Sequence, residues 1–305
     1  MRIALITPAR PGTRSGNRHT ALRWAAFLRA AGHRVSIATE WDGRAADVML
    51  ALHARRSHAS IKEFPGPVIL ALTGTDIYQD IHTSAEARQS IEIAQRLIVL
   101  QRKAAEEVPG RKVHVVVQSS STRLRHKPVQ KFRVCVIGHL RAVKDPLLTL
   151  RALQHVDRDL EVIQLGDLLE KSLKPQTSDP RYRWLGSVPH GRALKWLASS
   201  HVMVISSRME GGANVVCEAL RIGVPVLASR IPGNVGLLGE NYAGYFPVGD
   251  ERALARLIEQ DKRFYERLKR QIAPLRATVA PRSEAKALLA SFASLARSPR
   301  GRRHA

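Results

Sequence analysis

The chain has 305 residues, which is long for a single hydrophobic core and natural for two domains. Hydrophobic residues make up 44% and charged residues 25%, as in an ordinary soluble globular protein, so wholesale disorder, a collagen-like repeat and a coiled coil are excluded. Lysine and arginine number 49 against 26 aspartate and glutamate, and the net charge of +23 favours polyanions, phosphorylated small molecules or acidic membrane surfaces as partners.

Short apolar runs rich in β-branched residues alternate with segments of helical period in the first part of the chain. Between the first two runs lies NRHTALRWAAFLRAAG, where Asn17 can cap a helix and Gly32 can end it. This pattern is typical of a βαβ unit, so we expect a parallel sheet. The predicted strands are residues 2–7, 35–39, 47–52, 68–72, 97–100 and 113–117.

A polar, serine-rich stretch, QSSSTRLRHKPVQK, interrupts the pattern at residues 118–131 and indicates a domain boundary. A second βα series follows, with strands predicted at 132–137, 160–165, 202–205 and 225–228 and helices at 147–154, 192–198 and 214–222. The fold class is therefore α/β, with two Rossmann-like, doubly wound parallel-sheet domains facing a cleft.

We predict an N-terminal domain over residues 1–125 and a second domain over 126–262. Residues 263–305 are expected to form C-terminal helices and a basic tail that could pack back on the N-terminal domain. The stretch 251–297 is predicted to be helical with breaks at Pro274 and Pro281, and the last residues, SPRGRRHA, are expected to fray.

The two cysteines, Cys135 and Cys217, lie in apolar runs and are expected to serve packing rather than redox chemistry. The start, MRIALITPARPG, lacks the apolar run of a signal peptide, and no segment approaches the ~20 apolar residues of a membrane span. We therefore expect a cytoplasmic protein without integral membrane association. Its oligomeric state is left open.

The most informative loop is SSRMEGGANVVCEAL, which directly follows a predicted strand. Two glycines after Glu210 let the backbone approach an anionic group, and the N–H groups at the start of the next helix can hold it. Glu210 and Glu218 are then placed to accept hydrogen bonds from hydroxyls on either side of the anion. A nucleotide sugar, with its sugar hydroxyls, diphosphate and ribose hydroxyls, needs this arrangement.

Two further loops carry cations. In GHLRAVKDP, Arg141 and Lys144 precede a helix that we expect to start at Asp145 or Pro146. In TPARPGTRSGN, arginines surround two glycines, but the GxGxxG and GxxxxGK[ST] fingerprints are absent, which counts against NAD enzymes and NTPases.

The spacing of Glu210 and Glu218, followed by EALRIGVPVLAS and an IPG turn, resembles the donor-binding signature of the family 4 retaining glycosyltransferases of the two-Rossmann (GT-B) type. The strings LHARRSHASI, ALTGTDIY, GHLRAVKDP and SSRMEGGANVVCEAL are similar, more narrowly, to the selenosugar synthases of selenoneine biosynthesis. That resemblance implies transfer of a sugar from a UDP-sugar, in particular UDP-N-acetylglucosamine, to selenophosphate.

The resemblance also implies roles for single residues. Glu210 would contact the donor sugar, Glu218 the ribose and Lys144 the diphosphate, while no cofactor and no metal are implied. The donor-binding set is Gly16, Arg141, Lys144, Glu210, Gly211, Gly212, Ala213, Asn214, Val215 and Glu218. The acceptor-binding set is Arg14, Asn17, Arg18, Arg55, Arg56, His58 and Thr73, and the catalytic set is His53, Lys144 and Glu210.

Two positions depart from the family pattern. His139 stands where an arginine is usual, so Arg141 is expected to supply the second cation, and Thr73 stands where a sugar-contacting histidine is usual, so His53 is the candidate replacement. Selenophosphate is a soft, already anionic nucleophile that needs cations more than a general base, which suits these departures.

Simpler interpretations stay open. Arg55 and Arg56 could be a solvated helix face, and His53 could be a core histidine. The DRD string at residues 157–159 precedes a strand, at the sheet end opposite the expected site, so we expect no metal there. The alternative functions are an ordinary family 4 enzyme acting on a lipid or saccharide hydroxyl and a non-catalytic nucleic-acid binder, which the 5% aromatic content disfavours.

Overall fold

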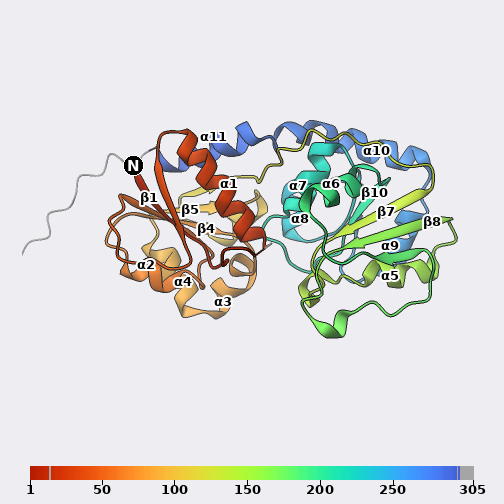
Figure 1. Cartoon of the computed structure of the whole chain (residues 1–305), viewed down its shortest axis with the longest axis horizontal. Helices are drawn as coiled ribbons and strands as arrows, with labels where there is room; N and C mark the ends of the chain where they lie inside the picture. The colour runs from red at the N-terminus through yellow and green to blue at the C-terminus, as the bar shows by residue number, and fades with distance from the viewer. Residues whose placement is uncertain (14, 294, 296–305) are drawn as a thin grey trace, which may run out of the picture. The chain divides into compact units, whose positions relative to one another are not determined.

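The protein forms two compact α/β units in a computed structural model that describes residues 1–13, 15–293 and 295. Of these residues, the first unit comprises 1–13, 15–117, 282–293 and 295, and the second comprises 118–281 (Figure 1). The predicted C-terminal segment is thus divided: α10 (Lys262–Ile272) lies in the second unit, whereas all but the first residue of α11 (Pro281–Phe292) lies in the first.

The first unit is built on a six-stranded parallel sheet in the order β2-β1-β3-β4-β5-β6. After β1 the chain adds β2 on one side, and from β3 onward it adds every strand on the other side. The strand order therefore reverses between the neighbours β1 and β3, as in flavodoxin-like sheets. Every predicted strand of this half is present, with ends that differ by at most two residues. The strands are β1 (Arg2–Ile6), β2 (Arg34–Ala38), β3 (Val48–Leu52), β4 (Val68–Leu72), β5 (Arg96–Val99) and β6 (Val113–Val115).

Both faces of this sheet are covered. All five residues of β3, VMLAL, are buried, and they alternate between two hydrophobic clusters. Met49 packs on the side of α2 (His58–Glu63) and α4 (Ala85–Ile93), whereas Leu50 packs on the side of α1 (Gly16–Ala30) and α11. This two-sided burial is why the strands are apolar throughout.

The first helix begins earlier than predicted. Ser15, and not Asn17, is its N-cap: its backbone is extended, and its hydroxyl accepts a hydrogen bond from the Arg18 amide at 3.3 Å. Asn17 already lies inside the first turn and cannot cap it. Gly32 adopts φ 84° in the turn that follows the helix, as a helix-ending glycine should.

The second unit contains another six-stranded parallel sheet, in the order β12-β11-β10-β7-β8-β9. Its order reverses between β7 and β10, the arrangement of a Rossmann domain. The edge strands β9 and β12 were not predicted, because three and two residues are too few to show a pattern. The strands are β7 (Phe132–Ile137), β8 (Leu160–Leu165), β9 (Tyr182–Trp184), β10 (Val202–Ile205), β11 (Val226–Ser229) and β12 (Tyr245–Phe246).

The helices predicted at 147–154, 192–198 and 214–222 are present, with ends that differ by at most two residues, but the helix over residues 232–238 was not predicted. No helix starts at Asp145 or Pro146: Asp145 is left-handed, with φ 41°, and ends a short 3₁₀ turn, Ala142–Lys144. The later helical stretch is broken at Pro274 and Pro281, as predicted, and also between α9 and α10. The helices are α5 (Leu148–Ala152), α6 (His190–Ala198), α7 (Asn214–Ile222), α8 (Pro232–Leu238), α9 (Glu251–Ile258) and α10.

Cys135 and Cys217 are both buried, and burial raises the pKa of the Cys135 thiol to about 12, so this thiol stays protonated at neutral pH. The predicted frayed tail, SPRGRRHA, lies outside the described residues. Over the described part of the chain, no helix is long and apolar enough to cross a membrane.

The C-terminal helix of the first unit is anchored by a buried carboxylate. Glu284 of α11 is 1% exposed and accepts hydrogen bonds from Arg23 Nε at 2.7 Å and from the buried Trp24 Nε1 at 2.7 Å. Both donors lie on α1, so this carboxylate joins the first and last helices of the unit.

Replacing Glu284 with alanine should destabilise the first unit by about 3 kcal/mol, because the Trp24 and Arg23 donors would lose their buried acceptor. Urea unfolding followed by fluorescence measures the change. As a control, Glu240→Ala removes a carboxylate that is 50% exposed from its ion pair with Arg230 and should cost at most about 1 kcal/mol. Equal effects of the two substitutions would contradict the anchoring role.

Candidate functional site

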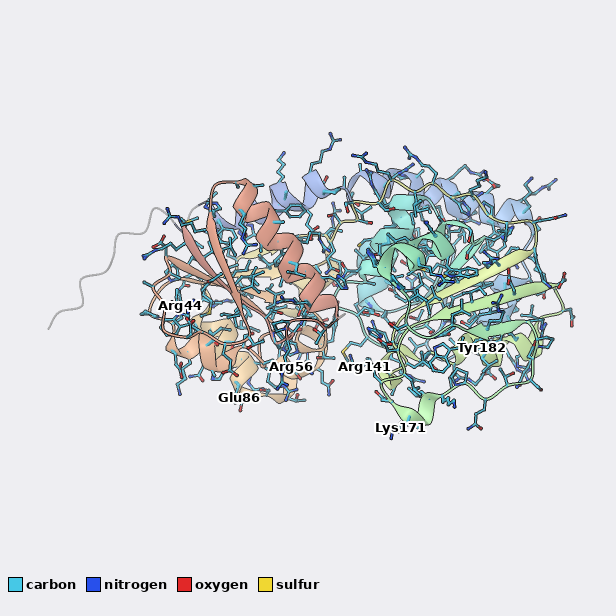
Figure 2. The ribbon with its side chains drawn as sticks, in the orientation of Figure 1. Arg44, Arg56, Glu86, Arg141, Lys171 and Tyr182 are labelled. Carbon is cyan, nitrogen blue, oxygen red and sulfur yellow. The ribbon has the colours of Figure 1, made fainter. Side chains whose placement is uncertain are left out.

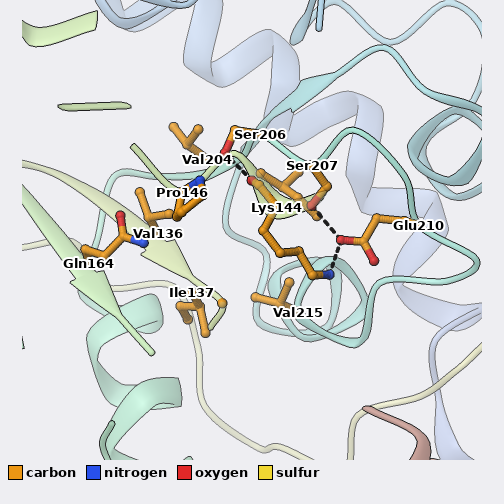
Figure 3. A pocket seen from close by; sticks show the side chains of 12 residues that line it. Val136, Ile137, Lys144, Pro146, Gln164, Val204, Ser206, Ser207, Glu210 and Val215 are labelled. Atoms are coloured by element: carbon orange, nitrogen blue, oxygen red, sulfur yellow. Dashed lines mark hydrogen bonds and ion pairs between the residues drawn. The ribbon is translucent and has the colours of Figure 1, made fainter. Parts of the chain in front are cut away.

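A small pocket lies at the reversal point of the second sheet, where ligands of doubly wound folds bind (Figure 3). The ends of β7 and β10 form its floor, through Ile137, Gly138 and Ile205. Lys144 lines it from the loop after β7, Glu210 from the loop after β10 and Val215 from the helix that follows. Its volume is about 30 Å³, room for one or two water molecules beside these side chains.

Lys144 and Glu210 form an ion pair in this pocket (Figure 3). The Lys144 ammonium group donates a hydrogen bond to Glu210 Oε1, and the Ser207 hydroxyl donates to the same oxygen at 2.6 Å. The Glu210 carboxylate is 8% exposed and the Lys144 side chain 33% exposed, so the lysine is the more accessible partner. An anion that binds Lys144 must therefore compete with Glu210 for its charge.

The loop that carries Lys144 is held in place by the loop after β10. The Ser206 hydroxyl lies 3.0 Å from the Lys144 carbonyl oxygen, and the Arg208 amide donates to the Val143 carbonyl at 2.8 Å. The buried Asp145 carboxylate accepts from Arg208 at 3.0 Å and from Arg151 at 3.1 Å. These contacts hold Asp145 in its left-handed conformation, which an aspartate otherwise adopts at an energetic cost.

The IPG turn, residues 231–233, packs against the backbone of Glu210. Gly233, on the first turn of α8, packs so close that a Cβ atom there would lie 2.0 Å from the Glu210 carbonyl oxygen. The Ser229 hydroxyl donates to the Ser207 carbonyl at 2.5 Å, and Asn234 donates to the Ser229 carbonyl at 2.8 Å. The end of β11 and the start of α8 thus determine where the Glu210 backbone lies.

Helix α7 follows the two glycines and brings Glu218 to the same side as the pocket. Val215 lines the pocket, and Glu218 is three residues further along the helix, on the same face. Its carboxylate is bound by His190 at 2.7 Å. No side chain caps the start of α7, where Ala213 is the N-cap residue, so this end suits an anionic ligand. Gly211, Gly212 and Asn214 lie at this turn.

Arg141 precedes the 3₁₀ turn of Lys144 and is exposed (Figure 2). His139, at the position where the family resemblance expects an arginine, accepts a hydrogen bond from the Asp167 amide at 3.1 Å. Its ring is therefore engaged with the loop after β8.

In the first unit, His53 follows β3 at the reversal point of the sheet. It adopts φ 79°, a strained conformation for a non-glycine residue, and is 4% exposed. Its Nδ1 accepts from the Arg56 amide at 3.4 Å, and its Nε2 lies 3.5 Å from Thr75 Oγ1 and 3.8 Å from Asp80. Burial lowers the pKa of His53, so its imidazole is neutral at neutral pH.

Two buried aspartates, which the sequence analysis did not single out, complete this cluster. Asp76 is fully buried and accepts hydrogen bonds from the backbone amides of Ala54 at 3.0 Å and Gly74 at 2.7 Å. It ties the loop after β3 to the loop after β4. Asp80, 5% exposed, faces His53 and pairs with Arg55 at 3.2 Å. The sequence signal for Asp76 was the GTD string at residues 74–76, which is separated from the end of the predicted strand 68–72 by one residue.

The predicted acceptor residues are only partly brought together. Arg55 and Arg56 are exposed in the turn before α2, not on the face of a helix. Figure 2 labels Arg56. Thr73 joins the cluster, and its buried Oγ1 has no hydrogen-bond partner among the described residues. His58, by contrast, turns toward α4, where its Nδ1 lies 2.9 Å from Ser90 Oγ.

The first turn of α1 contains Gly16, Asn17 and Arg18. The chain enters it from β1, which pairs with β3, so this turn and His53 follow adjacent strands at the same edge of the sheet. Arg14 lies outside the described residues.

No metal-binding group is formed where the structure is described: no three His, Cys, Asp or Glu side chains cluster suitably in those parts of the chain. Of the DRD string, Asp159 pairs with Lys131 at 2.7 Å at the amino end of β8.

Comparison with known proteins supports this architecture. Residues 131–260 match the family model described as glycosyl transferases group 1, a match that lies wholly within the second unit. Over 97% of this chain and all of that one, the structure is similar to sucrose-phosphate synthase from Thermosynechococcus elongatus, with 15% identity and a TM-score of 0.76.

A second similar structure is Anabaena Alr3699/HepE in complex with UDP and glucose, at 16% identity and a TM-score of 0.76, covering 96% of this chain and 100% of that one. The lipopolysaccharide outer core galactosyltransferase WaaB aligns over 96% of this chain and 99% of its own, with 12% identity and a TM-score of 0.67. The predicted α/β fold with two Rossmann-like units is therefore confirmed, and it is the GT-B fold.

Replacing Gly233 with alanine should displace Glu210, because the added methyl group would meet backbone rather than a flexible side chain. We expect a loss of about 1–3 kcal/mol in stability. Urea unfolding measures this change. Gly191→Ala is the matched control, because a Cβ there meets nothing within 4 Å. Unchanged stability in Gly233→Ala would refute this contact.

Proposed function

We propose that the protein is a UDP-sugar-dependent glycosyltransferase that transfers N-acetylglucosamine to selenophosphate. Selenium attacks the anomeric carbon, the bond from that carbon to the diphosphate oxygen breaks, and UDP leaves with the bonding electrons. Water cleaves the Se–P bond to release phosphate. The products are a selenosugar, UDP and phosphate.

The observation that carries the donor half of this proposal is the Lys144–Glu210 pair at the reversal point of the second sheet. A diphosphate bound to Lys144 would be stabilised by the ammonium charge and by the positive end of the α7 dipole. The Glu210 carboxylate, displaced from Lys144, would then accept hydrogen bonds from the sugar hydroxyls. The match to group 1 glycosyltransferases covers residues 131–260 of this unit, and the similar HepE structure is a complex with UDP and glucose.

The acceptor half rests on the resemblance of LHARRSHASI, ALTGTDIY and GHLRAVKDP to selenosugar synthases and on the exposed arginines of the first unit. A selenophosphate carries two or three negative charges and needs more than one cation, and arginine forms paired hydrogen bonds to phosphate oxygens. Arg56 and Arg55 follow β3 at the reversal point, where a ligand of the first unit would bind.

One observation favours a second candidate, transfer to a hydroxyl of a lipid or saccharide. The Nε2 atom of the neutral His53 ring lies 3.8 Å from the buried Asp80. A histidine with one nitrogen beside a carboxylate can take a proton from a hydroxyl nucleophile on the other nitrogen, here Nδ1, where the nucleophile would replace the Arg56 amide.

A direct assay separates the two acceptors. The purified protein is incubated with UDP-N-acetylglucosamine and enzymatically generated selenophosphate, and mass spectrometry is used to look for a selenium-containing sugar together with UDP. A parallel reaction supplies saccharide and lipid hydroxyls instead. Product only in the second reaction would overturn the selenophosphate proposal, and product in neither would overturn both.

Replacing both Arg55 and Arg56 with alanine should raise the KM for selenophosphate about tenfold or more and leave the Kd of UDP nearly unchanged, because only acceptor contacts are lost. Since Arg55 also pairs with the buried Asp80, Arg56→Ala alone tests the same role without that change. Arg44→Ala, at a side chain 86% exposed, is the control. An unaltered KM in both variants would assign these arginines to a solvated basic face.

Turnover should survive chelation, because Lys144 and the start of α7 supply the positive charge that a metal ion would otherwise give the leaving diphosphate. The measurement is the initial rate of UDP release with and without excess EDTA. Loss of activity with EDTA and its return with Mg²⁺ or Mn²⁺ would disprove metal independence.

A further inference from the structure

His190 occupies a position that neither the motifs nor the pocket assigns to function. It is the first residue of α6, directly after the N-cap residue Pro189, whose carbonyl accepts from the amides of Arg192 and Ala193 at 2.8 and 3.0 Å. Its backbone is thus fixed by the first turn of the helix. Its imidazole reaches Glu218 of α7, with Nε2 at 2.7 Å from Glu218 Oε1.

In this contact, Nε2 is the donor, because an ionised carboxylate only accepts hydrogen bonds. The hydrogen bond to Glu218 raises the pKa of His190, which favours the charged and stronger form of the donor. The Glu218 side chain is 15% exposed, so most of its surface is packed and its carboxylate has few orientations. One oxygen is bound by His190, and the carboxylate plane is thereby defined.

We propose that His190 is a positioning residue for the donor nucleoside: it holds Glu218 Oε1 so that the carboxylate is oriented to accept hydrogen bonds from the two ribose hydroxyls. This inference rests on the proposed function, in which Glu218 binds the ribose. Without His190, the Glu218 side chain would become ordered only when the nucleoside binds. The entropy lost in that ordering would reduce the free energy of binding.

The test is calorimetric titration of the full chain with UDP and with 2′,3′-dideoxy-UDP, which lacks both ribose hydroxyls. We expect His190→Ala to weaken UDP binding about tenfold and to leave binding of the dideoxy analogue within about twofold. His190→Gln, whose amide nitrogen can replace Nε2 as a donor, should restore most of the affinity. In the double variant with Glu218→Gln, the loss should not exceed that of Glu218→Gln alone, as expected for coupled residues.

His155→Ala is the matched control, because His155 is also a partly exposed histidine beside a carboxylate, Glu251, in the same unit. It should change neither affinity. If His190→Ala weakens both ligands equally, or neither, the positioning role is overturned while the proposed function stands. If UDP does not bind the unsubstituted protein, the proposed function fails first and the inference fails with it.

Discussion

The candidate site of the second unit is organised around one ion pair, between Lys144 and Glu210, at the point where its sheet reverses. The two side chains come from loops after neighbouring strands, β7 and β10. The surrounding contacts hold these two loops in place. Asp145, in the loop of Lys144, forms ion pairs with Arg151 and Arg208, and Gly233 packs against the backbone of Glu210. Because the two charges of this pair compensate each other, the diphosphate of the proposed donor would bind Lys144 by displacing Glu210.

The two units offer different chemistry at equivalent positions of their sheets. In the second, a cation, an uncapped helix start and two glutamates suit a nucleotide sugar. In the first, a neutral histidine in a strained conformation lies among buried aspartates, with two arginines exposed beside it. Strain of this kind persists only where the surroundings hold it, and here the Asp76 carboxylate does so by binding the amides of both adjoining loops.

The first unit carries groups that suit two kinds of acceptor. Arg55 lies against Asp80, so part of its charge is already compensated, whereas Arg56 has only its backbone amide bound to His53 in this cluster. An anionic acceptor would be bound mainly by Arg56, and a hydroxyl acceptor would be deprotonated mainly by His53. Both chemistries use the same loops after β3 and β4, which is why the assay with alternative acceptors decides between them.

The sequence by itself determined the two α/β series, nearly every long strand, and the loop with Glu210, its two glycines and Glu218, because these depend on local apolar patterning and on residues close in the chain. It did not reveal the short edge strands β9 and β12 or the cap at Ser15. Only the tertiary structure decided the partners of the charged groups: Lys144 meets Glu210 from 66 residues away, and His190 meets Glu218 from 28 residues away. Such pairings follow from strand order and helix packing, which no single stretch of sequence contains.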